Sequence, residues 1–456
     1  MLRARAVLVV LWVLQQILRQ LWLLGSPNGN LLRFGSEYGN IAESLVLQGS
    51  FADAMGPGTG PSAWMPPALC WLYATVFALF GVKSVDSALV LLTLKSLLTG
   101  VCLWHFLAMV HTRWGWRGLV GGVVLSLLWS ECDAHRFYAE LDDIWWVNGL
   151  ALAVLRQVLG QGSSGLGLLL ALLVPLSSPS LTLAWALVVL ARRPPRWPLI
   201  LGLMACSCLL WGARNQVALG RFYPVKSNLW FDFVEANLWD DDGLLTHSFF
   251  RLYHPINANS LQQQYRALGE VAFVESARQL ARQVPPQQWA RRCLRRLANC
   301  TLAMQIDWDL FPALQVPPED LPLLVESRWL VLHAGKPFWL FCLRPPERFQ
   351  QEMASLPLRQ PELVLQSRMA ACAELLRRHR QPRLWWSQWH FSLLPALALL
   401  VLLARRQERA VIALYLLFLL PYVLVQHYAR YQVSLVWVQH YLVLAGLLNG
   451  RRHQHG

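Results

Sequence analysis

The sequence predicts an all-α polytopic membrane protein with about ten transmembrane helices. Of its 456 residues, 55% are hydrophobic and only 14% are charged, a balance typical of chains that cross a bilayer repeatedly. Apolar runs recur along the chain, and arginines stand at their ends. The candidate spans are 6–24, 87–110, 118–132, 144–160, 165–178, 180–191, 197–213, 388–404, 410–426 and 433–449.

The stretch between residues 165 and 191 decides the topology. Pro175 and Pro179 flank two serines near its centre, so it forms either one kinked helix or two short helices. Counting two helices places all the basic clusters at helix ends on one side, as the positive-inside rule expects. We therefore expect a multi-pass protein of the plasma (inner) membrane with both termini in the cytoplasm. These clusters contain Arg3, Arg5, Arg113, Arg117, Arg156, Arg192, Arg193, Arg196, Arg405, Arg406, Arg409, Arg451 and Arg452.

The same topology divides the chain into three regions. The formal net charge is +14, but the arginines mostly border apolar spans or lie in one long loop. Orientation in an anionic bilayer explains this charge, so the lipid bilayer is an expected partner and nucleic acid is not. The regions are an N-terminal transmembrane module, 1–213, with outer loops at 25–86 and 133–143; a helical extracytoplasmic or interfacial segment, 214–387; and C-terminal transmembrane helices, 388–456.

The first outer loop is too long and too distinctive to be a simple connector. Its segment GSEYGNIAESL predicts an outer-face juxtamembrane helix that carries Glu37 and Glu43. A Gly/Pro-rich stretch follows, and Trp64 and Met65 then precede two prolines that open a short aromatic helix. The loop therefore predicts a functional site on the outer face.

A second acidic group precedes the fourth span. Glu140, Asp142 and Asp143 stand directly before Trp145 and Trp146. Carboxylates that bulky aromatic residues partly shield from water at a membrane boundary are candidate proton acceptors. The alternative is that they are ordinary interfacial acids paired with neighbouring arginines.

Several cations are placed to bind phosphate or pyrophosphate. Arg214 and Lys226 follow the seventh span, and Arg430 with Tyr431 follows the ninth, all on the predicted outer side. Lys95 lies inside the second span, where an ionisable residue is a functional candidate by default. The alternative for each cation is a charge that reaches the membrane surface without a ligand.

In order and spacing, these segments resemble the GT-C class of polytopic glycosyltransferases. This class includes protein O-mannosyltransferases and the aminoarabinose transferases of lipid A, and the chain is most similar to family-39-like bacterial members. The likeness covers most of residues 30–300 and returns at 427–449. The matching segments are GSEYGNIAESL, TGPSAWMPPALCWLYATVFALFG, YAELDD, RN…FYPVKSN, HPIN at 254–257, YRALGEVAF at 265–273, and ARYQVSLVW.

The resemblance implies a GT-C-like fold, an outward-facing active site and a polyprenyl-phosphate sugar as donor. It implies that Glu37 is the general base, where many relatives have Asp, and that the second-loop carboxylate is Asp142 or Glu140. The expected reaction transfers the sugar to an acceptor hydroxyl with inversion. The sugar, the acceptor (lipid, glycan or protein) and assistance by a divalent metal are left open. Further candidate acceptor-site residues in the matching segments are Glu43, Trp64, His254 and Asn257.

Two other classes of function remain as alternatives. A lipid-linked sugar flippase or transporter would need a polar path through the membrane, for which the sequence offers only Lys95 and scattered serines. A non-catalytic membrane assembly protein would need no acidic pair. Convergence of Glu37, Asp142 and Arg430 at one outer cavity would favour the enzyme over both.

Overall fold

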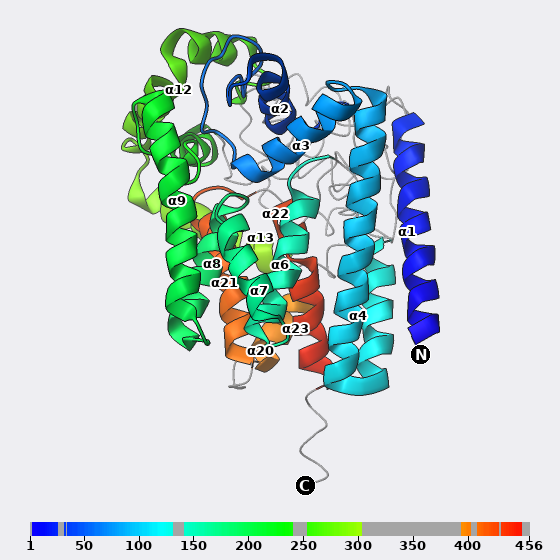
Figure 1. Cartoon of the computed structure of the whole chain (residues 1–456). Helices are drawn as coiled ribbons and strands as arrows, with labels where there is room; N and C mark the ends of the chain where they lie inside the picture. The colour runs from blue at the N-terminus through cyan, green and yellow to red at the C-terminus, as the bar shows by residue number, and fades with distance from the viewer. Residues whose placement is uncertain are drawn as a thin grey trace, which may run out of the picture.

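The computed structural model describes residues 2–25, 32, 34–130, 141–239, 253–302, 394–402, 408–427 and 430–448. These residues are mostly helical and contain no β-strand, which confirms the all-α class. The long helices pack side by side as a bundle, and α2, α3 and α12 cover one end of it (Figure 1). We call this the loop end, and the end where α1 (Leu2–Gly25) begins and α23 (Val436–Leu448) finishes the opposite end.

The second and third predicted spans form one helical hairpin, α4 (Val85–Ser130). The chain reverses near Gly115, whose φ of +61° lies in the left-handed region that suits glycine. Gly122 on the returning arm then lies against Leu107 and Val110 of the first arm. The first arm therefore runs from the loop end to the opposite end, and the second arm returns.

Helix α6 (Ile144–Val158) runs parallel to the first arm of α4. Gly149 faces Leu98, and the Arg156 Nη1 lies 3.1 Å from the His105 Nδ1, so both contacts join residues 51 apart in sequence. This constant offset gives the register between the two helices. It also places the start of α6 at the loop end.

The stretch 165–191 forms two helices, α7 (Ser164–Leu173) and α8 (Pro179–Arg192). The Trp146 indole N–H donates to the Ser177 hydroxyl at 2.9 Å, so the connection lies near the start of α6. The Arg192 guanidinium donates to the Val158 carbonyl at 2.6 Å, which places the end of α8 beside the end of α6. Helices α7 and α8 therefore run in opposite directions.

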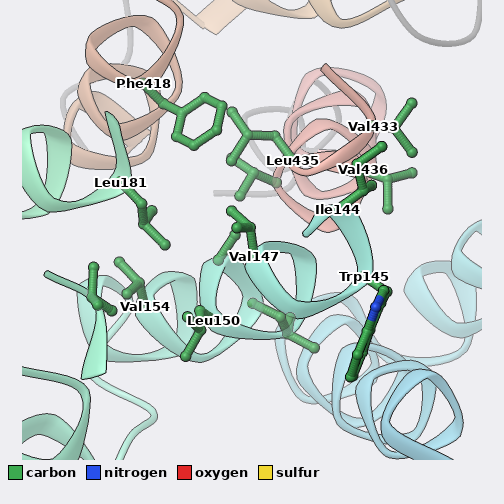
Figure 2. Packing of buried hydrophobic residues seen from close by; sticks show 14 of the residues in the cluster. Ile144, Trp145, Val147, Leu150, Val154, Leu181, Phe418, Val433, Leu435 and Val436 are labelled. Atoms are coloured by element: carbon green, nitrogen blue, oxygen red, sulfur yellow. The ribbon is translucent and has the colours of Figure 1, made fainter. Parts of the chain in front are cut away.

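Apolar side chains of α6 form the centre of the bundle core. Figure 2 shows Val147, Leu150 and Val154 facing Leu181 of α8 and Phe418 of α21 (Arg409–Leu424). Val433, Leu435 and Val436 close the core around the start of α23. Helices α9 (Trp197–Leu219) and α20 (Leu394–Leu402) complete the set that coincides with the ten predicted spans.

Two stretches in the described part are long and apolar enough to cross a membrane: 85–127 within α4, and α9. The other helices at predicted spans do not meet both criteria. These findings support association with a membrane, and the count of ten spans stays a prediction.

Further helices lie at or near the loop end. They are α2 (Glu37–Gln48), α3 (Pro67–Phe80), α10 (Leu229–Val234), the π-helix η2 (Glu235–Trp239), α12 (Asn259–Ala281) and α13 (Pro286–Leu302). Prolines begin α3 and α13, where a missing backbone N–H costs nothing. The predicted helical stretch 260–303 is therefore two helices, broken where Pro285 and Pro286 stand. Residues 303–387 lie outside the described residues.

Candidate active site

Acidic residues from both predicted outer loops meet at the loop end. The Tyr38 hydroxyl on α2 donates to the Asp143 carboxylate at 3.1 Å, a contact between residues 105 apart in sequence. Gly35, with a φ of +66°, makes the approach possible, because a Cβ there would lie 2.8 Å from the Leu141 carbonyl oxygen. We call Glu37, Asp142 and Asp143 the acidic cluster. Glu140 lies outside the described residues.

The start of α6 holds one member of the cluster in place. The Asp142 side chain is buried, and its Oδ1 accepts the Ile144 N–H at 3.0 Å. Free N–H groups and the positive end of the helix dipole favour negative charge at this position. Asp142 is therefore held at the helix terminus by this hydrogen bond.

His254 approaches Glu37 from the side of α12. Its Nε2 lies 3.4 Å from the Glu37 Oε1, and the two side chains are only 8% and 15% exposed. The His254 Nδ1 accepts the Ile256 N–H at 3.3 Å, so the ring proton belongs on Nε2, facing Glu37. The turn is closed by the Asn257 N–H, which donates to the His254 carbonyl at 3.0 Å. Asn257 thus shapes this turn, and His254 orients the carboxylate.

A buried carboxylate anchors the loop behind His254. Trp64 is fully buried, and its ring lies edge-on to His254 with centroids 6.0 Å apart. Glu270 on α12 accepts hydrogen bonds from the Ser62 hydroxyl (2.6 Å), the Ala63 N–H (2.8 Å) and the Tyr265 hydroxyl (2.7 Å). Burial raises the pKa of Glu270, and these hydrogen bonds act in the other direction. The loop that positions Trp64 is therefore tied to α12.

Helix α3 supplies a residue that the sequence analysis missed. Burial raises the pKa of the Tyr73 hydroxyl well above its ordinary value, and Asp142 and Asp143 raise it further. Burial likewise raises the pKa of the Cys70 thiol, with a contribution from Glu37. Both side chains therefore lie within electrostatic range of the acidic cluster. Their spacing of three residues on an apolar helix was the available signal, but it also fits ordinary core packing.

Lys95 lies close to the acidic cluster, displaced from it toward the opposite end of the bundle. It is fully buried, whereas its neighbours Leu94 and Leu97 are exposed on the outside of α4. The register of α4 against α6 sets Lys95 level with Trp146, about 5 Å along the bundle axis from the cluster. Lys95 therefore points into the bundle instead of reaching its surface.

The segment with Arg430 and Tyr431 is next to the start of α6. It forms α22 (Arg430–Val433), and the Asn148 amide donates to the Val433 carbonyl at 3.2 Å. Tyr431 stacks on Tyr422 of α21, with ring centroids 4.3 Å apart. The side chain of Arg430 lies outside the described residues. Its backbone lies about one helical turn from the Asn148 contact.

Three predicted site residues contact protein groups outside the acidic cluster. The Arg214 guanidinium donates to the Phe51 carbonyl and the Ser62 carbonyl, and Lys226 pairs with Asp232 at 3.3 Å. Glu43 pairs with Lys83 at 2.7 Å. Among the described residues, no group of three His, Cys, Asp or Glu side chains is arranged to hold a metal ion.

No family model, characterised protein or solved structure matches this chain. The geometry of the site itself indicates its chemistry. It combines a carboxylate held by a histidine, two further carboxylates, a buried tyrosine hydroxyl and a buried lysine nearby. Such a set can accept a proton from a hydroxyl and stabilise charge on a neighbouring phosphate.

Proposed function

We propose that this protein is a membrane glycosyltransferase that moves a sugar from a polyprenyl-phosphate donor to an acceptor hydroxyl. One observation carries the proposal: Glu37 and the acids at the start of α6 converge from separate loops at one end of a helical bundle. Like charges brought together in a partly buried site cost free energy, so such clusters are typical of catalytic sites.

Apolar surface supports the membrane location. Only 22% of the apolar window of α9 is buried, whereas the core helix of a soluble protein is mostly buried. Leu209, Leu210 and Val217 are among its exposed residues. We infer ten spans in the plasma (inner) membrane, with the loop end outside and both termini in the cytoplasm. The predicted basic clusters at Arg113, Arg156 and Arg192 then occupy the cytoplasmic end.

Glu37 acts as the general base in the proposed reaction. It takes the proton of the acceptor hydroxyl as that oxygen attacks the anomeric carbon of the donor sugar, which inverts the configuration. His254 orients the carboxylate, and Asp142 with Asp143 favours a positively charged sugar carbon in the transition state. The bond from the sugar to phosphate breaks, and the phosphate leaves on the polyprenyl carrier.

Lys95, Arg430 and Tyr431 are the candidates for holding the donor phosphate. Lys95 is buried close beneath the cluster, and α22 packs next to the start of α6. A cation at this position would neutralise charge that develops on the leaving phosphate. Lys226 and Arg214 contact other protein groups, which makes them weaker candidates for this role.

The test uses two glutamates of the same helix. The purified protein in nanodiscs is incubated with a panel of polyprenyl-phosphate sugars, and release of the free polyprenyl phosphate is measured. Glu37→Gln should lower the rate by roughly 10²–10⁴-fold, the usual contribution of a general base. Glu43→Gln, the matched control, should leave it nearly unchanged because Glu43 pairs with Lys83. Full activity of Glu37→Gln, or no release from any donor by the unaltered protein, would contradict the proposal.

A further inference from the structure

A cavity of about 660 Å³ lies apart from the acidic cluster, between the end of α2, the loop at 50–61, α3 and the end of α9. Neither Glu37 nor the start of α6 lines it. Its volume is within the range of small-molecule sites. The lining residues are Leu45, Gln48, Gly49, Ser50, Phe51, Ala52, Asp53, Gly58, Gly60, Pro61, Trp71, Trp211, Arg214 and Ala218.

The formal charges of the side chains that line this cavity sum to zero. Arg214 and Asp53 are the one cation and the one anion among its lining residues. A phosphate or a lipid phosphate headgroup would meet the Asp53 carboxylate, and a cationic ligand would meet Arg214. A neutral ligand avoids both costs.

The polar groups keep hydrogen-bonding capacity for such a ligand. Arg214 donates to the carbonyls of Phe51 and Ser62 and to the Asn215 side chain, which uses three of its five N–H groups. Asp53 accepts from the Gly60 N–H at 2.9 Å and from the Gln48 amide at 3.0 Å, and a carboxylate can accept more. The cavity therefore offers both donors and acceptors.

Aromatic rings form the apolar part of the cavity lining. Trp71 is 44% exposed and meets Trp211 edge-on, with ring centroids 6.0 Å apart. The Arg214 guanidinium lies over both Phe51 and Trp211, which fixes it in position. Aromatic faces that pack against C–H groups, next to groups that bind hydroxyls, suit a sugar ring.

We propose that this cavity binds a neutral saccharide and that the acceptor of the reaction is an oligosaccharide. Gln48 at the cavity and Glu37 at the acidic cluster mark the two ends of α2, about 17 Å apart. Remote sugar units occupy the cavity while the terminal unit presents its hydroxyl to Glu37. The acceptor role rests on the proposed function, whereas saccharide binding by the cavity does not.

Saturation-transfer NMR on the full chain in nanodiscs tests the binding. The probes are methyl glycosides of glucose, galactose, mannose and N-acetylglucosamine, with their disaccharides, and inorganic phosphate as competitor. At least one glycoside should receive saturation. Trp71→Ala and Gln48→Ala should each weaken its binding about tenfold, the effect of losing one ordinary contact. Trp230→Ala, an exposed tryptophan of α10 outside the cavity, is the matched control and should change nothing.

Several outcomes would overturn the saccharide site: no saturation of any glycoside, an equal loss in Trp230→Ala, or displacement of the glycoside by phosphate. Glu37→Gln separates the two proposals, since it should abolish transfer and leave glycoside binding intact. Binding without any transfer by the unaltered protein would refute the enzyme and retain the site. If transfer occurs, Trp71→Ala should raise KM for an oligosaccharide acceptor more than for a monosaccharide. Equal KM effects would refute the acceptor role.

Discussion

The two ends of the bundle differ in how their carboxylates are partnered. At the opposite end, Glu408 is fully buried and pairs with Arg113, and it also accepts the Tyr441 hydroxyl at 2.9 Å. At the loop end, Glu37 pairs with His254, and the neighbouring Tyr38 donates to Asp143 from the second loop. A carboxylate paired with a guanidinium joins helices, whereas acids brought to one end of the bundle from separate loops suit a site for chemistry. The comparison therefore separates a structural pair from the proposed active site.

Breaking the pair at the opposite end should have the largest effect on stability. Arg113→Ala leaves Glu408 buried without its guanidinium, and we expect a loss of about 3 kcal/mol in the free energy of unfolding. SDS titration in mixed micelles measures it. Arg117→Ala, which removes a neighbouring arginine, is the control and should change stability little. An Arg113→Ala protein as stable as the unaltered chain would refute the structural assignment of this end.

Removing the histidine at the loop end should affect turnover more than stability. His254→Ala should lower kcat about tenfold, because the Glu37 carboxylate loses a partner that orients it. His254→Gln retains an N–H donor and should recover part of the rate. KM for the donor should stay nearly constant in both variants. If KM rose while kcat held, His254 would be binding substrate and would not be positioning the base.

The sequence predicted the helices well because their causes are local. Apolar runs, prolines at helix starts and the break near Pro175 and Pro179 predict the all-α class and the separate helices α7 and α8. The hairpin of α4 follows from the gap between two predicted spans. The number of spans that cross the bilayer depends on a membrane boundary that helix length alone does not set.

The candidate site was only partly predictable, because its geometry depends on contacts distant in sequence. Glu37 and Asp142 stood out as acids in an apolar chain, but the contact through Tyr38 and the partner of Glu37 had no local signal. Arg214 looked like a phosphate ligand because a free cation and one bound to carbonyls have the same sequence pattern. Tyr73 was missed because a tyrosine on an apolar helix usually packs in the core.

Glu270 should make the stability of the loop end depend on pH. Burial raises its pKa above the ordinary value of 4.5, so the folded chain binds a proton more tightly than the unfolded chain. The free energy of unfolding should therefore fall as pH rises from 4.5 to the pKa of the folded state, and level off above it. Glu270→Gln removes this proton and should flatten that fall. Thermal melts across this pH range measure the change in stability, and Glu275→Gln is the exposed control on the same helix. If the stability of Glu270→Gln still fell with rising pH, the assignment to Glu270 would be contradicted.

The partly exposed pair between Glu43 of α2 and Lys83 tests whether burial matters to the comparison. Lys83 lies 2.7 Å from Glu43 and also donates to the Asn40 side chain at 2.7 Å, but both charged groups are about 30% exposed. Water and salt screen such a pair, so Lys83→Met should cost at most about 1 kcal/mol, and less in high salt. Melts at low and high ionic strength measure the difference. A loss comparable with that of Arg113→Ala would mean that pairing alone, and not burial of the pair, decides what a carboxylate contributes in this protein.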